Sequence, residues 1–178
     1  FNISKGAIRG IGREYGLGLM LKPTDNINLS IRTSKQDRPG SMQWVGVVED
    51  ENGINIIYSN TERKQTNTEV RLNVAFSPKM TFEAYYQPFS VTMDYKDYNR
   101  LDEEGSLNVS PYPYSGNKDF QIDNKVGTFV FRWEYLPGSL IYAVYNLNDN
   151  NYYSAEDSEW SNSKSNSLFL KFDYFFQL

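Results

Sequence analysis

The chain contains no cysteine and no histidine among its 178 residues. Without cysteine it can form neither disulfides nor thiolate metal sites. Without histidine it lacks the commonest general base, the Ser-His and Asp-His hydrolytic arrangements and most zinc sites. Any catalysis would have to rely on carboxylates, lysine or tyrosine.

Long apolar runs are also missing, because no stretch approaches the roughly 20 residues of a membrane-spanning helix. A helical membrane protein is therefore excluded. A barrel is not, since strands of about 9 to 11 residues can cross a bilayer with half of their residues polar. The formal net charge of -4 argues against nucleic acid as a partner. The first residues, from Phe1, carry no signal peptide, so we expect a carboxy-terminal piece of a longer protein.

Aromatic residues and period-two alternation are what the chain has in abundance. It contains 14 Tyr, 11 Phe and 3 Trp, residue types that suit strands and membrane interfaces. The segment TEVRLNVAFS (68–77) places apolar Val70, Leu72 and Val74 opposite polar residues, as a strand with one apolar face does. We count about nine such strands.

The predicted connections alternate between two lengths. Tight turns are expected near residues 23–26, 50–53, 77–79 and 136–139. Longer polar loops are expected near residues 34–41, 60–67, 90–125 and 148–166. Short turns at one end and long loops at the other are typical of outer-membrane barrels. We therefore predict an all-β, antiparallel transmembrane outer-membrane β-barrel, with residues 1–178 as the carboxy-terminal part of one larger barrel domain. An odd strand count needs further strands or a partner chain for closure.

The two faces of the predicted strands differ in a way that favours an apolar exterior. The minority face carries four positive and four negative side chains, which we assign to a lumen charge network: Arg32, Glu69, Arg71, Glu83, Arg132, Glu134, Lys171 and Asp173. The opposite face is rich in aromatic rings, as a lipid-facing belt requires. The alternative is a soluble, lipocalin-like barrel or sandwich with the apolar face inward.

The closing segment SLFLKFDYFFQL (167–178) alternates apolar and polar residues up to its end. It resembles the carboxy-terminal signal read by the barrel assembly machinery, with Leu178 in place of the usual final aromatic residue. We expect Lys171 and Asp173 to face the lumen and the even-numbered residues to face the membrane. The carboxy terminus is then periplasmic.

Candidate sites are few. Aromatic residues in the two longest predicted loops could stack on sugars or pack on a partner, and we take them as candidate ligand-binding residues: Tyr112, Tyr114, Tyr152, Tyr153 and Trp160. Acidic residues in the last loop match no defined cation loop, so no metal site is predicted: Asp149, Glu156, Asp157 and Glu159. Adjacent carboxylates such as Glu103 and Glu104 rarely hold the fixed separation that glycoside hydrolysis requires. In RWEYLPGS (132–139) we expect inward charges, outward rings and a Pro-Gly turn rather than a ligand site.

Several segments resemble one family of Gram-negative outer-membrane proteins that has no characterised function. They are RLNVAFSPKMTFEAYYQPF (71–89), the adjoining Tyr95–Tyr98 stretch, FRWEYLPGSLIYAVY (131–145) and SLFLKFDYFF (167–176), in order over about the last two thirds of the chain. The resemblance implies an amino-terminal domain similar to family-nine carbohydrate-binding modules, followed by a carboxy-terminal β-barrel. It implies no catalytic residues.

The function expected from these patterns is non-enzymatic: a membrane anchor, a pore or a subunit of a larger outer-membrane assembly. The expected partners are outer-membrane lipid, the barrel assembly machinery and other outer-membrane subunits, with no cofactor. The alternative from another class is a soluble β-protein that binds a lipid or sugar in an apolar interior.

Overall fold

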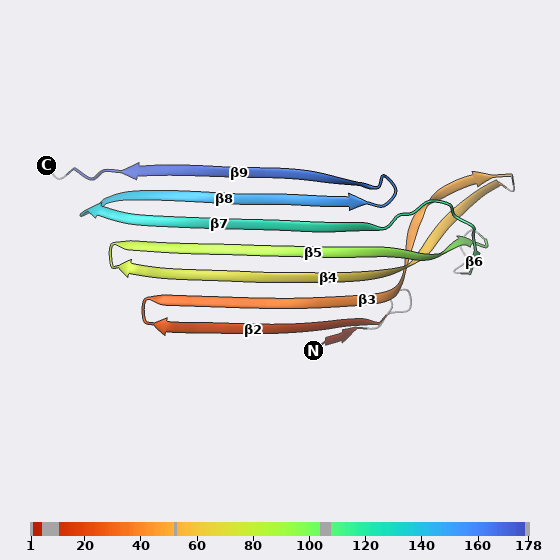
Figure 1. Cartoon of the computed structure of the whole chain (residues 1–178), viewed down its shortest axis with the longest axis horizontal. Helices are drawn as coiled ribbons and strands as arrows, with labels where there is room; N and C mark the ends of the chain where they lie inside the picture. The colour runs from red at the N-terminus through yellow and green to blue at the C-terminus, as the bar shows by residue number, and fades with distance from the viewer. Residues whose placement is uncertain (1, 5–10, 52, 104–107, 177–178) are drawn as a thin grey trace.

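A computed structural model describes residues 2–4, 11–51, 53–103 and 108–176 of the chain. Every helix or strand assigned among these residues is a β-strand (Figure 1). The strands are β1 (Asn2–Ser4), β2 (Gly12–Thr24), β3 (Ile27–Asp50), β4 (Gly53–Ser77), β5 (Met80–Leu101), β6 (Val109–Pro111), β7 (Phe120–Leu136), β8 (Ser139–Ser154) and β9 (Glu159–Asp173). The prediction of an all-β chain is confirmed.

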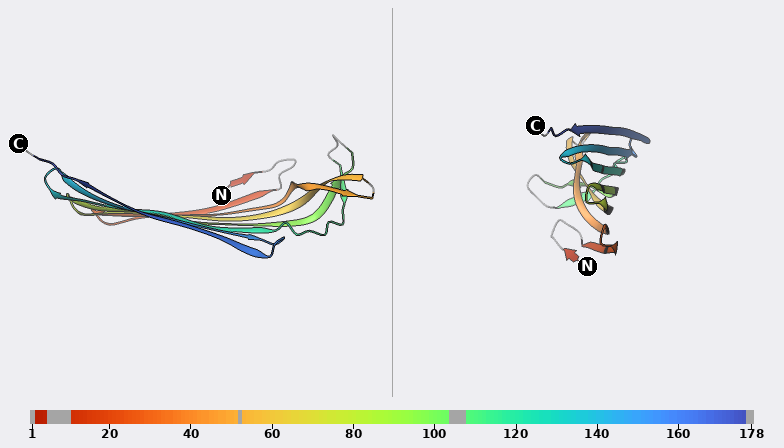
Figure 2. Two further views of the ribbon diagram at one scale, coloured as in Figure 1. Left: turned by 90° about the horizontal axis from the view of Figure 1, so that it is seen from above. Right: turned by 90° about the vertical axis from the view of Figure 1, so that its left-hand side faces the viewer.

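The strands of the described residues form one antiparallel sheet in the order β1-β2-β3-β4-β5-β7-β8-β9, with β6 paired to β5. Each long strand therefore pairs with its neighbours along the chain, as hairpin connections dictate. The sheet is not closed as a barrel, because β1 and β9 lie at its two edges. Figure 2 shows one twisted layer with no second sheet over either face.

The tight turns lie where the sequence places them. β2 and β3 are joined at residues 25–26, β4 and β5 at 78–79, and β7 and β8 at 137–138. These three turns lie at one end of the sheet, which we call the turn end (Figure 1). The remaining connections lie at the other end, which we call the loop end, and the β3–β4 turn there also matches its predicted position at 50–53.

Two of the four predicted loops are wrong, because residues 34–41 and 60–67 are parts of β3 and β4. These segments pair with each other, from Ser34 opposite Asn67 to Ser41 opposite Thr61. Two predicted strands merge into β3 and two into β4, which gives strands of 24 and 25 residues. An antiparallel ladder is held by backbone hydrogen bonds, so it can continue through residues that are polar on both faces.

The other two predicted loops are real but shorter. β5 continues to Leu101 and β7 begins at Phe120, so the predicted loop over 90–125 shrinks to a connection over 102–119 that contains β6. The loop predicted over 148–166 shrinks to residues 155–158. β9 accordingly starts at Glu159 and ends at Asp173, before the apolar alternation does. Leu178, which ends the predicted carboxy-terminal signal, lies outside the described residues.

Irregularities in β3, β4 and β5 bend the sheet near the loop end. Register shifts separate Arg38 from Ser41 and Trp44 from Gly46 on β3. A third shift at Ser59/Asn60 leaves one extra residue, Asp97, on β5 with φ 55°. Bulges increase the local twist and bend a strand. The β3–β4 tip accordingly turns out of the plane of the other strands (Figure 2).

The described residues bury few apolar side chains, as expected for a single layer. Ile57, Val91 and Met93 are buried, at 0%, 5% and 6% exposure. Two polar neighbours are equally buried and are satisfied: the Ser59 hydroxyl donates to the Lys96 carbonyl at 2.8 Å, and the Thr61 hydroxyl to the Ser41 carbonyl at 2.8 Å. This small core lies beneath the bend.

Candidate functional site

The register of the ladder collects the predicted apolar residues on one face of the sheet, which we call the apolar face. Directly opposed residues of an antiparallel pair point to the same side. One row runs Leu21, Leu29, Leu72, Ala84, Phe129, Tyr145 and Leu168 across β2, β3, β4, β5, β7, β8 and β9. The alternation predicted separately for each strand therefore adds up to one continuous surface.

Three further rows flank this one. Toward the turn end lie a row through Phe82, Phe131 and Ala143 and then a row through Met80, Trp133 and Ile141. Toward the loop end lies a row through Ile31, Val70 and Tyr86. The four rows span six residues of one strand, or about 20 Å at roughly 3.3 Å per residue. We call them the apolar band.

The apolar face becomes polar beyond the band on the loop side. The next row contains Lys125, Asp149 and Lys164, and the Lys164 Nζ lies 3.5 Å from the Asp149 carboxylate. The row after it contains Asp123, Asn151 and Asn162. On β8 and β9 the strands thus continue past the apolar band with polar side chains, whereas on β2 Leu17 and Tyr15 continue the apolar side.

The eight charged residues predicted to form a lumen network lie on the other face, which we call the polar face. The register opposes Arg32 to Glu69, and Arg132 to Thr81 and Tyr142. Lys171 lies opposite Tyr142 on β9. The predicted shared face is thus present, but whether it lines a lumen stays a prediction.

Contacts among these charges are local rather than a single network. Within the described chain, two ion pairs involve them: Glu69 with Arg71 at 3.7 Å, and Lys171 with Asp173 at 2.9 Å. Both pairs join residues two apart on one strand. The Arg71 guanidinium also lies 4.7 Å from the Tyr85 ring centroid, a cation–π contact. Glu134 accepts a hydrogen bond from the Gly138 N–H at 3.0 Å, at the β7–β8 turn.

Aromatic rings gather on the polar face at the loop end. Tyr98 packs on Tyr114 with ring centroids 4.6 Å apart, and Phe120 packs on Tyr152 at 5.9 Å. Tyr95 joins them through a 6.5 Å contact with Phe120. We call these five residues the loop-end aromatic cluster. Burial raises the pKa of the Tyr95 and Tyr98 phenols.

The five predicted ligand-binding aromatics do not converge on one site. Tyr114 and Tyr152 belong to the loop-end aromatic cluster. Tyr112 donates its hydroxyl to the Asp50 carboxylate at the β3–β4 tip, at 3.1 Å. Tyr153 and Trp160 face each other across β8 and β9 with centroids 5.3 Å apart. Because Tyr153 is odd-numbered on β8, this pair lies on the side of the apolar face.

The sequence reading missed Tyr95, Tyr98 and Phe120. The sequence does contain a signal for Tyr95. On β5 the alternate positions of the polar face hold polar residues near the turn end, but farther along they hold Val91, Met93 and Tyr95. An apolar run on the polar face indicates that another segment covers it. Residues 112–119 of the connection between β5 and β7 contact Tyr95 and Tyr98 at the loop end of this run.

Polar contacts fasten this connection to its surroundings. The Asp119 carboxylate accepts a hydrogen bond from the Tyr95 N–H at 2.6 Å, and the Asp119 carbonyl accepts one from the Ala155 N–H at 2.9 Å. The Lys118 ammonium donates to both carboxylate oxygens of Glu156, at 2.6 and 2.5 Å. That hydrogen bond raises the pKa of Lys118. The connection is thus held by β5 and by the β8–β9 turn.

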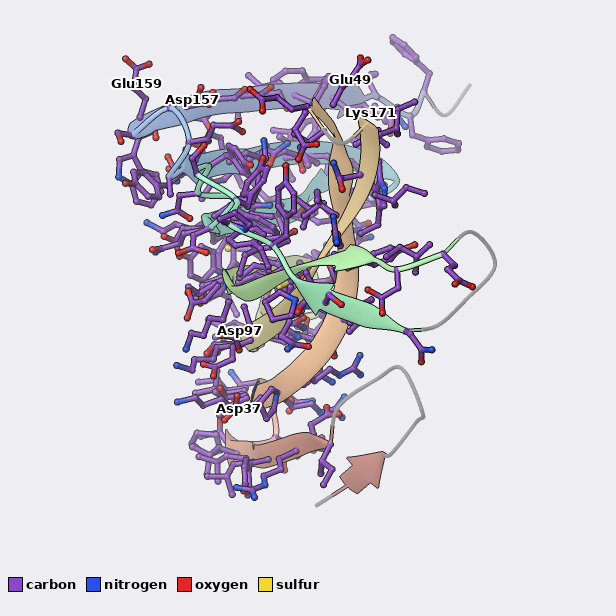
Figure 3. All side chains as sticks on the ribbon, turned by 90° about the vertical axis from the view of Figure 1, so that its right-hand side faces the viewer. Asp37, Glu49, Asp97, Asp157, Glu159 and Lys171 are labelled. Atoms are coloured by element: carbon purple, nitrogen blue, oxygen red, sulfur yellow. The ribbon has the colours of Figure 1, made fainter. Side chains whose placement is uncertain are left out.

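The acidic residues of the loop end are dispersed. No group of three or more metal-ligating side chains occurs in the part of the chain that the structure describes. Asp97 and Asp157 come from different elements and lie apart in Figure 3. Glu103 lies in an exposed bend after β5. Glu104, the adjacent carboxylate of that pair, lies outside the described residues. Among those residues there is also no helix long and apolar enough to span a membrane.

Fold and surface together define an all-β protein with one open antiparallel sheet that is apolar on one face and polar on the other. Its sequence from residue 9 to residue 177 matches the model of a family described as a domain of unknown function, DUF5916. The chain belongs to this family. No curated protein sequence and no solved structure matched it.

Proposed function

We propose that this sheet is part of the wall of a β-barrel in the outer membrane of a Gram-negative bacterium, with lipid against the apolar face. Its role is non-enzymatic: it anchors a module, forms a pore or serves as a subunit of a larger outer-membrane assembly. The resemblance described above adds an upstream domain similar to family-nine carbohydrate-binding modules. That domain would link the barrel to carbohydrate binding.

The observation that carries this proposal is the limited height of the apolar band. Outer-membrane barrels carry an outward apolar band about 25 Å tall, flanked by aromatic residues. The four rows span about 20 Å between Cα positions, and side chains at both margins add to that height. Trp133 lies in the row nearest the turn end and Tyr86 in the row nearest the loop end. The band ends at the same row on β3, β4, β5, β7 and β8, where polar residues or Pro88 follow, and only on β2 do Leu17 and Tyr15 extend it.

Exposure of the apolar face also supports a lipid contact. Leu168, Leu170 and Phe172 on β9 are 63%, 59% and 66% exposed. An apolar surface of this extent needs a partner, and lipid is one that fits a continuous band. The soluble alternative requires a second layer over the band. The described residues supply none.

An open sheet also needs closure, because unpaired strand edges are not tolerated in the hydrocarbon core. We propose that other strands of the same protein or a partner chain pair with the free edges at β9 and at the β1–β2 side. The turn end, where the three connections are two-residue turns, then faces the periplasm, and the loop end, which carries the long 102–119 connection, faces the outside. The segment that the barrel assembly machinery would engage is the end of β9, which lies at the turn end.

Tryptophan quenching by brominated lipid tests the placement. Two single-tryptophan forms of the full-length protein retain either Trp133 or Trp160 from this chain, with the other tryptophans replaced by phenylalanine. Both residues lie on the side of the apolar face. Trp160 lies six residues beyond the last apolar row on β9, or about 20 Å. In vesicles brominated part-way along the acyl chains, Trp133 should lose most of its fluorescence and Trp160 little.

Equal, weak quenching of both residues would contradict the lipid contact. A second measurement is the mobility of the full-length protein from outer-membrane fractions on a detergent gel with and without heating. A heat-dependent shift is expected for a closed barrel. Recovery of the full-length protein as a detergent-free soluble monomer would favour the soluble alternative instead.

A further inference from the structure

We propose that Arg38 and Arg63 form a binding site for an oxyanion, a carboxylate or phosphate group, on the polar face near the bend. The two residues are directly opposed on β3 and β4, so both side chains leave the same face. Like charges directly opposite each other destabilise a sheet. This site goes beyond the barrel function and does not depend on the membrane placement.

Neither arginine is neutralised in the described part of the chain. The ion pairs there involve neither Arg38 nor Arg63. Arg63 donates from Nη2 to the Gln65 side-chain oxygen, an uncharged acceptor. The Arg38 side chain has no hydrogen-bond partner among the described residues. A guanidinium carries five donors, so most donors of this pair are available to a ligand.

Nearby acidic residues do not serve as counterions. Asp37, the neighbour of Arg38, is opposed to Arg13 and Lys64 on the other face of the sheet. Glu14 lies on the polar face one row from Arg38, opposite Gln36, and its carboxylate accepts a hydrogen bond from the Gln36 amide at 3.4 Å rather than forming an ion pair with either arginine. The two arginines are therefore a local excess of positive charge in a chain whose formal net charge is -4.

The arginines open onto a cavity rather than onto a flat surface. Its volume is about 370 Å³, and it is lined by Arg38, Ser41, Met42, Gln43, Thr61, Arg63 and Met93. Two of these lining residues, Thr61 and Met93, are buried, at 1% and 6% exposure. The bulge between Arg38 and Ser41, where Gly40 has φ 72°, turns β3 around the cavity. The bend of the sheet thus shapes this site.

The lining chemistry fits an anion. Guanidinium groups bind carboxylate and phosphate oxygens in a bidentate manner, which gives strength and orientation. The Gln43 side-chain oxygen accepts a hydrogen bond from the Tyr95 hydroxyl at 3.5 Å. The amide N–H groups of Gln43 are then available as further donors. The Thr61 hydroxyl is committed to the Ser41 carbonyl. Two arginines and one amide therefore provide donors in a cavity whose lining contains no carboxylate.

Calorimetric titration of the full-length protein with inorganic phosphate, and separately with citrate, tests the site. Arg38→Gln and Arg63→Gln should each weaken binding by about tenfold or more, as expected for the loss of hydrogen bonds to a charged group. The double variant should show no saturable binding. Arg100→Gln removes the same charge at the same end of the sheet but lies outside the cavity, and it should bind like the unmodified protein. Comparing the two probes distinguishes a phosphate from a carboxylate ligand.

A thermal unfolding series separates binding from folding. Phosphate or citrate should raise the melting temperature of the unmodified protein and of Arg100→Gln, but not that of the double variant. Without anion, Arg38→Gln should be at least as stable as the unmodified protein, because the like-charge opposition is removed. The proposal is overturned if neither probe binds saturably to the unmodified protein. It is also overturned if the double variant binds unchanged, or if Arg100→Gln loses binding to the same extent.

Discussion

An exposed ion pair joins β4 and β5 near the bend, with the Lys96 Nζ 2.8 Å from the Glu62 carboxylate. The hydrogen bond from Lys96 is the main cause that lowers the pKa of Glu62, and it also raises the pKa of Lys96. A carboxyl group whose pKa is lowered by folding contributes stability at pH values above its pKa in the unfolded chain. That contribution is lost as pH falls through its pKa in the folded protein. A lysine whose pKa is raised by folding contributes stability at pH values below its pKa in the unfolded chain. That contribution is lost as pH rises through its pKa in the folded protein. The pair therefore stabilises the sheet between these two limits.

Lys96→Met should raise the pKa of Glu62 toward its ordinary value, as measured by ¹³C NMR titration of the labelled carboxylate in the full-length protein. Lys64 lowers the same pKa only through a smaller, longer-range attraction. Lys64→Met should therefore move it much less. A Glu62 pKa that is unchanged in Lys96→Met would show that the pair does not form.

Gly138 occupies a backbone conformation that other residues adopt at a cost. Its φ is 77°, it follows Pro137 in the β7–β8 turn, and an added Cβ would lie 3.0 Å from the Cβ of Phe175. Gly138→Ala should lower the free energy of unfolding by about 1–2 kcal/mol, measured by urea unfolding of the full-length protein. Gly46→Ala, which meets no atom within 4 Å, should change it little. Equal losses in both variants would contradict this account of the turn.

Residues of the loop-end aromatic cluster show how far sequence reasoning reaches at this scale. Tyr114 and Tyr152 could be singled out as loop aromatics, but their partners Tyr98 and Phe120 come from strands. Those contacts depend on where the 102–119 connection folds back, and no local pattern encodes its path. Arg38 and Arg63 are likewise opposed because of the β3–β4 register. Since the sequence predicts loops at both positions, it does not predict that the two residues pair.

At the scale of elements, two side-chain contacts hold the 102–119 connection to neighbouring elements, and each can be removed separately. Its Tyr112 hydroxyl reaches Asp50 on the β3–β4 tip, and its Lys118 ammonium reaches Glu156 in the β8–β9 turn. Loss of one attachment should increase local opening without unfolding the sheet. We therefore expect Tyr112→Phe and Lys118→Ala each to accelerate limited proteolysis within the connection.

Tyr153→Phe is the matched control, because Tyr153 packs on Trp160 on the other face of the sheet. Its rate of cleavage in the connection should equal that of the unmodified protein. Cleavage that is unaffected by both test variants would show that the two contacts do not restrain the connection.

The sequence predicts the strands wherever one face is apolar, but it does not predict the lengths of the strands. Alternation in β5 and β7 identified their halves near the turn end, because the apolar band imposes period two there. Residues 34–41 and 60–67, toward the loop end, are polar on both faces, so they have the composition of a loop while pairing as a ladder. The bulges that bend this half, at Asp97 for instance, leave a similarly weak trace in composition.

At the scale of the whole molecule, the proposal fixes which face of the sheet meets lipid, and two consecutive residues test it. Phe129 lies in the apolar band opposite Ala84 and Tyr145, whereas Val130 lies on the polar face opposite Glu83 and Val144. The chain has no cysteine, so Phe129→Cys and Val130→Cys each provide a unique attachment point within it for a spin label. In lipid vesicles, the label at 129 should collide often with oxygen and rarely with a water-soluble nickel complex, because oxygen concentrates in hydrocarbon. The label at 130 should show the lower oxygen-to-nickel ratio of the two.

The same pair of labels distinguishes lipid contact from a packed protein interior. If the apolar band were covered by another layer of protein, the label at 129 would be shielded from both colliders and immobilised. If the faces were reversed in the assembled barrel, the label at 130 would have the higher oxygen-to-nickel ratio. Either result would contradict a lipid-facing band, because the register forces adjacent strand residues to opposite sides of a single layer. A high oxygen-to-nickel ratio at 129 alone is the outcome that an outward apolar face requires.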